Sequence, residues 1–291
     1  MPSSRPELKA PPEFFYNEEE ARKYTTSSRI IEIQAKLTER ALELLALPDD
    51  GIPRVLLDIG CGSGLSGETL SENGHHWIGL DISQSMLDVA LEREVEGDLL
   101  LADMGQGLGL RPGVVDGAIS ISAVQWLCNA DKASNEPRLR LKAFFGSLYR
   151  CLTRGARAVL QLYPENEAQL EMITTSAMRS GFAGGVVVDF PHSTRAKKYF
   201  LVLTCGPPSL STALPKAKGE EGESCSDDDS SDEENHTVTI SDRHRPRKKM
   251  KVNKKGKGRE WVLKKKEQMR RKGHSLPPDT KYTARKRKSR F

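Results

Sequence analysis

Between residues 30 and 206, segments of helical periodicity alternate with segments of strand periodicity. Residues 30–47 place apolar side chains three or four positions apart, and Pro48 ends this expected helix. Residues 54–59 (RVLLDI) form a short apolar run followed by glycines, which predicts a buried parallel strand. The same patterns predict further strands at 76–80, 99–101, 113–121 and 157–162, helices at 65–72, 85–94, 138–152 and 167–179, and a closing strand pair at 184–189 and 199–203.

This alternation predicts an α/β fold for residues 51–206. Strands that alternate with helices favour a mainly parallel sheet, here of seven strands, with helices on both faces. The expected architecture is therefore Rossmann-like, and residues 1–50 precede it as a helical segment.

The composition changes after Cys205. Residues 207–241 have the composition of an acidic low-complexity linker, and residues 220–234 within it hold nine acidic residues and almost nothing apolar. Residues 242–291 hold 22 Lys/Arg against 4 Asp/Glu, and residues 260–272 within them have the composition of a basic helix. Because such segments cannot bury enough apolar surface to fold alone, we expect a disordered basic C-terminal tail.

The charge is divided in the same way. The whole chain carries +5, but residues 207–291 carry +11 and residues 1–206 carry −6. A mildly acidic body with a basic tail indicates that nucleic acid or another polyanion binds the tail, and the same clusters are typical of nuclear import signals. A solvated charge run without a partner is the alternative.

Several classes of protein are disfavoured. No apolar run approaches about 18 residues, and residues 1–10 are polar, so we expect neither a membrane span nor a secretory signal. The five cysteines are odd in number and form no CxxC pair, which favours a reducing compartment and disfavours a metal site.

The segment from Asp58 to Gly64 (DIGCGSG) carries the most information about function. It follows a predicted strand and precedes a predicted helix. Glycines at 60, 62 and 64 permit a tight turn and close approach of the backbone to a ligand, and a helix N-terminus adds free N–H donors. Residues 62–67 also match the GxGxxG pattern of dinucleotide-binding enzymes, so the loop alone does not distinguish the two classes.

Three aspartates favour a methyltransferase over a dehydrogenase. Asp58 lies inside the turn, where it would suit a cationic ammonium and would repel a pyrophosphate. Asp81 ends the next strand, in reach of ribose hydroxyls in either class. Asp103 ends the third strand, where it is placed to accept from the exocyclic amine of adenine, with the N–H of Met104 beside the ring. The alternative is that these acids are turn and cap residues of a non-catalytic domain.

In combination, these motifs resemble class I S-adenosylmethionine-dependent methyltransferases over residues 55–162. The resemblance implies that S-adenosylmethionine is the cofactor and that no metal is needed. The cofactor-binding residues expected on this basis are Asp58, Gly60, Cys61, Gly62, Gly64, Asp81, Ile82, Asp103, Met104 and Ser120.

Residues 116–129 (DGAISISAVQWLCN) form the fourth strand and the segment that leaves its carboxyl end, at the edge where open α/β sheets bind ligands. They contain no Asn-Pro-Pro-Tyr motif for amine methylation, the chain has no cysteine pair for carbon methylation, and no catalytic base is evident. Guanine N7 accepts a methyl group without losing a proton, so acid–base residues are not required. Gln125, Trp126 and Tyr163 are the candidates for positioning such a base, although Trp126 could equally pack in the core and Tyr163 could simply end a strand.

The chain also resembles one particular family, the eukaryotic small-subunit (18S) ribosomal RNA guanine-N7 methyltransferases. The resemblance rests on residues 11–17 (PPEFFYN), 56–70 (LLDIGCGSGLSGETL), 118–130 (AISISAVQWLCNA), 160–166 (LQLYPEN) and 282–291 (YTARKRKSRF), and it weakens at residues 207–242. It implies methylation of a guanine in the precursor of the small subunit and a role in subunit maturation. It also implies a heterodimer with a small zinc-binding activator protein, and a location in the nucleus, nucleolus or nucleoplasm, with the cytoplasm as a further location.

The N-terminal segment has a counterpart in such enzymes. Residues 14–28 resemble the part that folds over the cofactor, which makes residues 1–50 a cofactor lid and places Tyr24 near the methionine moiety. Phe14, Phe15 and Tyr16 are expected to anchor this lid to the core.

Three functional hypotheses remain open. The first is an rRNA guanine-N7 methyltransferase. The second is a small-molecule or protein methyltransferase with an incidental tail. The third is a ribosome assembly factor whose binding role, rather than methyl transfer, is its main function.

Overall fold

The computed structural model describes residues 5–130, 135–193, 196–206, 217–218, 263, 266, 270 and 278–279. The chain divides into two compact units, residues 1–233 and residues 234–291. Within the described residues, no helix has the length and apolar character needed to cross a bilayer.

The first unit is built on a seven-stranded sheet in the order β3-β2-β1-β4-β5-β7-β6. All neighbouring strands pair in parallel except β7, which runs antiparallel to both β5 and β6. The strands are β1 (Val55–Ile59), β2 (His76–Asp81), β3 (Asp98–Leu101), β4 (Val115–Ile121), β5 (Leu152–Leu162), β6 (Phe182–Asp189) and β7 (Lys198–Cys205). This confirms the predicted Rossmann-like class I methyltransferase fold.

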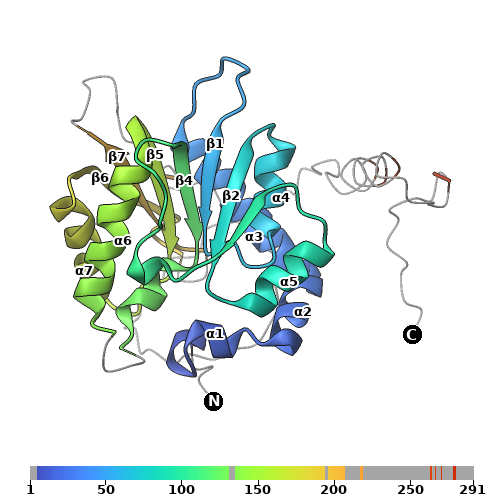
Figure 1. The fold of residues 1–291 in the computed structure, drawn as a ribbon, viewed down its shortest axis with the longest axis horizontal. Coiled ribbons are helices and arrows are strands. Elements are labelled where there is room, and N and C mark those ends of the chain that lie inside the picture. Colours follow the sequence, from blue (N-terminus) through green and yellow to red (C-terminus); the bar gives the residue numbers. More distant parts are fainter. Residues whose placement is uncertain are drawn as a thin grey trace, which may run out of the picture. The chain divides into compact units, whose positions relative to one another are not determined.

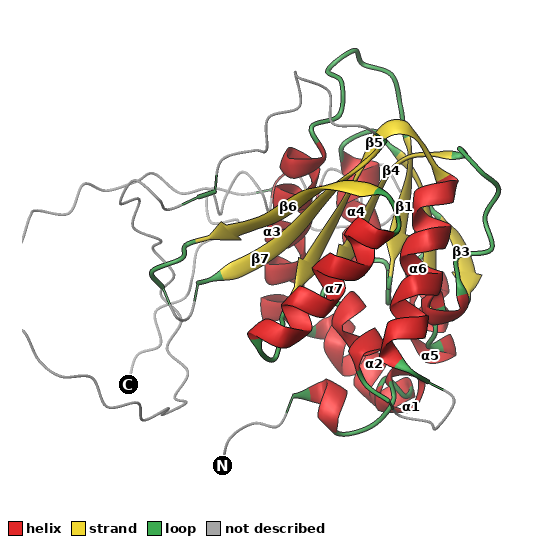
Figure 2. Cartoon of the chain, turned by 90° about the vertical axis from the view of Figure 1, so that its left-hand side faces the viewer, coloured by secondary structure: helices red, strands yellow, loops and turns green. Residues whose placement is uncertain are grey.

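Helices cover both faces of the sheet (Figures 1 and 2). One core cluster packs α6 and α7 on one face, and a second packs α3, α4 and α5 on the other. The α-helices are α1 (Pro12–Phe15), α2 (Glu18–Thr26), α3 (Ser28–Leu45), α4 (Leu65–Glu72), α5 (Gln84–Glu92), α6 (Pro137–Cys151) and α7 (Glu167–Arg179), and the short 3₁₀ helices are η1 (Pro6–Leu8), η2 (Met104–Gln106) and η3 (Val124–Cys128).

The predicted elements and the observed ones differ at their ends. The helix expected at 30–47 begins earlier because Ser27 caps it, its hydroxyl accepting from the N–H of Ile30, and it ends at Leu45 before Ala46 in the left-handed region. The fifth strand starts at Leu152 instead of 157, because its first residues continue directly from α6. The short helices η1, α1 and α2 had no periodic signal of their own, and they form against the body of the first unit.

The predicted linker touches the body at the two of its residues that the structure describes. Ala217 packs against the second core cluster, and the N–H of Lys218 donates to Asp189 Oδ1 at 2.8 Å. Asp189 also accepts two hydrogen bonds from the Arg40 guanidinium of α3. Most of the linker predicted at 207–241 lies outside the described residues.

The second unit is described at five positions. Residues 263, 266 and 270 are helical, within the segment expected to form a basic helix. Lys266 and Arg270 each form an ion pair with Asp279, at 2.8 and 2.7 Å. The prediction of disorder for the rest of the tail lies outside the described residues.

Candidate cofactor and base-binding site

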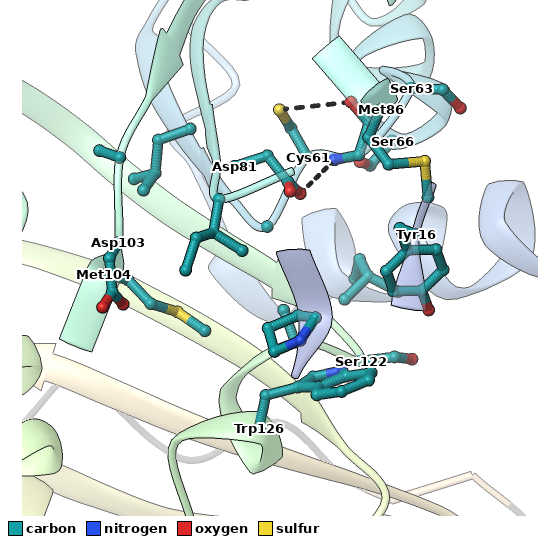
Figure 3. Close-up of a pocket in the computed structure, with 18 of the residues that line it drawn as sticks. Tyr16, Cys61, Ser63, Ser66, Asp81, Met86, Asp103, Met104, Ser122 and Trp126 are labelled. Carbon is teal, nitrogen blue, oxygen red and sulfur yellow. Dashed lines mark hydrogen bonds between the residues drawn. The ribbon is translucent and has the colours of Figure 1, made fainter. Parts of the chain in front are cut away.

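A pocket lies at the carboxyl edge of the sheet, over the ends of β1, β2 and β4. Figure 3 shows Asp81 beside the glycine loop, Asp103 and Met104 at one end of the cavity, and Tyr16 and Trp126 across from them. This is the edge at which open α/β sheets bind ligands. The predicted site residues that line the pocket are Tyr24, Gly60, Cys61, Gly62, Asp81, Ile82, Asp103, Met104 and Trp126.

The glycine loop adopts a backbone that L side chains rarely adopt. Gly60, Gly62 and Gly64 have φ values of 74°, 53° and 76°. A Cβ atom on Gly60 would come within 2.3 Å of the Ala123 Cβ atom, because the loop passes directly against the segment that leaves β4. Both the left-handed turn and this close approach require glycine at position 60.

Asp81 ties the glycine loop to β2. Its Oδ2 atom accepts from the N–H of Gly62 at 2.9 Å, and its Oδ1 atom accepts from the N–H of Ser83 at 2.8 Å. Burial raises the pKa of Asp81, while the N–H groups of Ser83, Gly62 and Ile82 oppose that rise by stabilising the carboxylate. Asp81 therefore orders the loop and presents a carboxylate to the pocket.

Asp58 lies beneath the loop, fully buried, and does not line the pocket. Ser66 donates to its Oδ2 atom at 2.6 Å, while its Oδ1 atom has no hydrogen-bond partner. Burial, reinforced by the charge of Asp81 and opposed by Ser66, raises the pKa of Asp58 to about 7. A buried carboxyl oxygen without a donor indicates a missing polar partner such as a water or a ligand group.

Asp103 is held by two donors at the other end of the pocket. Its Oδ1 atom accepts from the N–H of Gly105 at 2.8 Å and from Arg140 Nη2 at 2.7 Å. Arg140 reaches it from α6 and lies so close to the backbone of η2 that a Cβ atom on Gly105 would come within 2.3 Å of the guanidinium. Arg140 was not predicted from the sequence, because only the fold brings α6 to this position.

At the end of β4, the residue that lines the pocket is Ser122 and not the predicted Ser120. Ser120 is fully buried and donates to the carbonyl oxygen of Ile59, so it joins β4 to β1 and does not line the pocket. Ser122 lines the pocket instead, with a φ of 58° and its hydroxyl donating to Gln161 Oε1 at 2.5 Å. Strained non-glycine backbone of this kind occurs preferentially at functional sites.

The three candidates for positioning a base lie in different surroundings. Trp126 is 6% exposed and lines the pocket, so it both packs and faces the cavity. Gln125 is buried next to it and donates to the carbonyl oxygen of Ser122 and to Glu7 Oε1. Tyr163 does not line the pocket, and Lys198 Nζ lies 5.5 Å from the centre of its ring.

The N-terminal segment closes one side of the pocket. Ser83 Oγ donates to the carbonyl oxygen of Tyr16, and Gln34 Nε2 donates to the Tyr24 hydroxyl, both at 2.8 Å. Thr25 Oγ1 donates to Ser63 Oγ in the glycine loop at 2.7 Å. These contacts place α1 and α2 against the pocket, where a cofactor lid was expected.

The arrangement fits S-adenosylmethionine in its donor chemistry. Carboxylates at the two ends of the pocket, Asp81 beside the glycine loop and Asp103 beyond β3, suit a ligand with ribose hydroxyls and an adenine amine. Within the described part of the chain, no group of three or more His, Cys, Asp or Glu residues is arranged to hold a metal ion.

Two family models match parts of the chain. A family model described as a methyltransferase domain matches residues 57–160, and a model described as a methyltransferase involved in Williams-Beuren syndrome matches residues 203–289. A solved phosphoethanolamine N-methyltransferase 2 of Haemonchus contortus, in complex with S-adenosyl-L-methionine, is similar with a TM-score of 0.50 and 17% identity, over 66% of this chain and 58% of that one. At that identity the likeness supports the fold alone.

Curated relatives are far more similar in sequence. The chain is 73% identical to the 18S rRNA (guanine-N(7))-methyltransferase RID2 of Arabidopsis thaliana, over 99% of this chain and 100% of the relative. It is 60% identical to the 18S rRNA (guanine-N(7))-methyltransferase of Mus musculus, over 99% of each chain. It is 50% identical to the 18S rRNA (guanine(1575)-N(7))-methyltransferase of Saccharomyces cerevisiae, over 99% of this chain and 100% of the relative. The chain therefore belongs to the family of S-adenosylmethionine-dependent 18S rRNA (guanine-N7)-methyltransferases.

Proposed function

We propose that this pocket binds S-adenosylmethionine beside one splayed guanine of 18S rRNA, and that the protein methylates that guanine at N7 during maturation of the small subunit. The observation that carries the proposal is one pocket that Asp81 and Asp103 line beside an aromatic surface, with Asp58 buried beneath its glycine loop. Full-length similarity to curated enzymes of this activity supports it.

Each acid has a distinct part in holding the cofactor. Asp81 accepts from the ribose hydroxyls, and Asp103 accepts from the adenine amine while Arg140 and the Gly105 N–H fix its orientation. Asp58, whose Oδ1 atom lacks a donor, stabilises the ammonium group through water or the loop. When bound, the cofactor supplies a methyl group on a positively charged sulfur.

The protein's own part in the reaction is placement. Guanine N7 has a free lone pair, so the pocket needs no general base, and none of the described pocket residues is positioned as one. Tyr16 and Trp126 provide aromatic surface for the base and exclude water from it. Holding both reactants in line is the main catalytic contribution of such a site.

The direct test is transfer of a labelled methyl group to small-subunit RNA or its precursor by the purified protein with its activator. We expect one labelled guanine, identified as 7-methylguanine. Deletion of residues 207–291 should lower activity on RNA and make the remaining activity less sensitive to salt, because fewer phosphate contacts remain. A small-molecule methyltransferase would keep full turnover without the tail and would leave the RNA unlabelled.

Asp58 should make cofactor affinity depend on pH near neutrality. Because its pKa is raised to about 7, Asp58 is neutral below that pH and ionised above it. Only the ionised form attracts a cationic ligand, so affinity for S-adenosylmethionine should rise with pH, by about tenfold in total between about pH 5.5 and 8, and then level off. Calorimetric titration across this range measures the effect.

Asp58→Asn should remove that pH dependence and weaken binding about 10-fold at about pH 7.5. The exposed Asp98→Asn in β3 serves as the control and should leave the pH profile unchanged. The raised pKa also means that the free energy of unfolding falls as pH rises from about 4 to 7, a slope that Asp58→Asn should flatten. An identical pH profile in wild type and Asp58→Asn would contradict the assignment.

For the partner, we propose that the small zinc-binding activator pairs with the edge strand β3. This strand ends the sheet and pairs with β2 alone among the described residues. It exposes Leu100 and Leu101 at 38% and 57%. An open strand edge with exposed leucines is a template for pairing with another chain and is prone to aggregation when uncovered.

Leu101→Asp should weaken association with the activator at least about 10-fold without lowering the melting temperature, because this side chain is largely exposed. Leu139→Asp is the matched control, since Leu139 is 60% exposed on α6 and is not part of the edge strand. Sedimentation of the two proteins mixed in equal amounts measures the effect. An isolated chain that is monodisperse and fully active would contradict the proposal.

We propose further that the basic tail directs the protein to the nucleus and nucleolus and contributes salt-sensitive contacts to RNA. The charge of +11 over residues 207–291 supports both roles, because basic clusters release counterions from phosphates and also serve as import signals. Imaging of the full chain beside a chain ending at residue 241 tests the location.

A further inference from the structure

The 3₁₀ helix η1 is tied to the two segments that leave β4 and β5. The Arg5 guanidinium donates to the carbonyl oxygens of Tyr163 and Pro164, at 2.8 and 3.1 Å. Asn129 Nδ2 donates to the carbonyl oxygen of Glu7 at 2.8 Å. These contacts join residues that are 122 to 159 positions apart, and they fix Glu7 against the segment from which the candidate base contacts come.

The Glu7 carboxylate is placed there without a counter-charge. Gln125 Nε2 donates to its Oε1 atom at 3.1 Å, and no basic side chain of the described residues forms an ion pair with it. The Gln125 Oε1 atom is buried and has no hydrogen-bond partner. The site therefore holds several acceptor oxygens and too few donors, which indicates a ligand that brings donors of its own.

Aromatic rings adjoin this carboxylate. Tyr16 and Trp126, both lining the pocket, have ring centroids 6.0 Å apart, and Phe15 lies 6.1 Å from Trp126. Burial raises the pKa of Tyr16, and the neighbouring Tyr24 hydroxyl and Glu7 carboxylate add to that rise. Through its hydrogen bond with Gln125, Glu7 adjoins the segment that brings Trp126 to the pocket.

The chemistry of guanine matches such a site. Its Watson–Crick edge presents two adjacent donors, N1–H and the N2 amine, which a carboxylate can accept together in charge-assisted hydrogen bonds. N7 lies on the opposite edge of the base, so reading N1 and N2 leaves N7 free to face the methyl group. Adenine instead presents the N1 lone pair at that edge, which a carboxylate repels.

We propose that Glu7 reads the Watson–Crick edge of the target guanine, accepting from N1–H and the N2 amine, while Gln125 orients its carboxylate and Trp126 contacts the base. This inference rests on the proposed function and assigns its base specificity to the N-terminal segment.

Such a contact would also favour the reaction. The N7 lone pair forms the bond to the methyl carbon as the carbon–sulfur bond breaks, and the electron pair of that bond stays on sulfur. The positive charge thereby moves onto the guanine, and no proton leaves N7. N1–H becomes more acidic as this charge develops, so its hydrogen bond to Glu7 strengthens in the transition state. An interaction that strengthens in this way raises kcat.

The test compares RNA carrying guanine with RNA carrying inosine at the position that wild type methylates. Inosine keeps N7 and N1–H but lacks the N2 amine. Wild type should prefer guanine by about 30-fold in kcat/KM, because loss of a charge-assisted hydrogen bond leaves a carboxylate oxygen unpaired. In Glu7→Ala this preference should fall to within about 3-fold, and turnover on guanine should fall about 100-fold.

Glu7→Gln keeps the size of the side chain and one acceptor oxygen, so it should fold normally and lose most of the kcat with little change in cofactor affinity. Glu19→Gln removes the same charge from an exposed position of α2 and should behave as wild type. If Glu7 only anchored the lid, its variants would bind S-adenosylmethionine more weakly and would lose guanine and inosine turnover equally, which would overturn the proposal. Wild type that labels no RNA while binding the cofactor would instead refute the proposed function.

Discussion

Replacing Asp81 by lysine should abolish measurable binding of S-adenosylmethionine, with a loss of affinity of at least about 100-fold. The Asp81 carboxylate accepts from the N–H groups of Gly62 and Ser83, so it both orders the glycine loop and faces the pocket. Lysine would leave those two donors unpaired, remove the acceptor for the ribose hydroxyls and place a cation in a pocket that receives a cationic ligand. Calorimetry with the activator present measures the effect.

The control for this experiment is Glu96→Lys, which makes the same charge change at an exposed position before β3. It should bind the cofactor like wild type, and both variants should keep the far-ultraviolet spectrum of the fold. Binding by Asp81→Lys within about 3-fold of wild type would show that the cofactor site is assigned to the wrong residues.

Asp81→Lys also distinguishes the hypothesis that methyl transfer is the main function from the hypothesis that the protein acts mainly as an assembly factor. If small-subunit maturation in cells survives Asp81→Lys while methylation is lost, the binding role of the protein is its main one. If maturation fails and the variant protein still joins the precursor particle, the methyl transfer itself is required.

The sheet could be predicted from the sequence because apolar runs of strand length alternate with segments of helical periodicity. The acids at 58, 81 and 103 could be predicted for the same reason, since each lies within two residues of the carboxyl end of one of those runs and parallel strands share their carboxyl edge. Local pattern and fold agree at these positions.

At Ser120 and Ser122, the strand pattern did not predict which side chain lines the pocket. Alternation along β4 predicts that Ser120 and Ser122 point to the same face of the sheet, and the sequence favoured Ser120 as a cofactor contact. In the structure Ser120 donates to β1, while Ser122 leaves the strand with a φ of 58° and lines the pocket. Its hydroxyl turns to Gln161, a partner 39 positions away, which no local pattern reveals.

Glu7 and Arg140 were beyond prediction for a related reason. Glu7 meets Gln125 across 118 positions, and Arg140 meets Asp103 across 37. η1 has three residues and no buried side chain, so it lacks the periodicity from which a helix is predicted. Contacts of this kind become visible only once the sheet has brought the segments together.

The last glycine of the GxGxxG match, Gly67, is required because it packs against the ring of Trp77. A Cβ atom on Gly67, in α4, would come within 2.1 Å of the Trp77 ring, and one on Gly97 would come within 2.3 Å. Trp77 is 3% exposed on β2, and its Nε1 atom donates to Ser71 Oγ at 3.0 Å, so the ring has little room to move. Gly67 therefore permits close packing of helix on sheet and needs no nucleotide to explain it.

Gly67→Ala should consequently lower the free energy of unfolding by about 3 kcal/mol, through overpacking against a ring that cannot shift. Gly146→Ala is the matched control, because Gly146 also lies in a helix but a Cβ atom added there would meet nothing within 4 Å, and alanine at this position should stabilise by about 0.5–1 kcal/mol. Urea unfolding measures both. In a Trp77→Leu background, itself destabilised by about 3 kcal/mol, the added cost of Gly67→Ala should nearly vanish, because the clash is with the ring alone. An equal cost of Gly67→Ala in both backgrounds would place its effect elsewhere, in the glycine loop or in α4 itself.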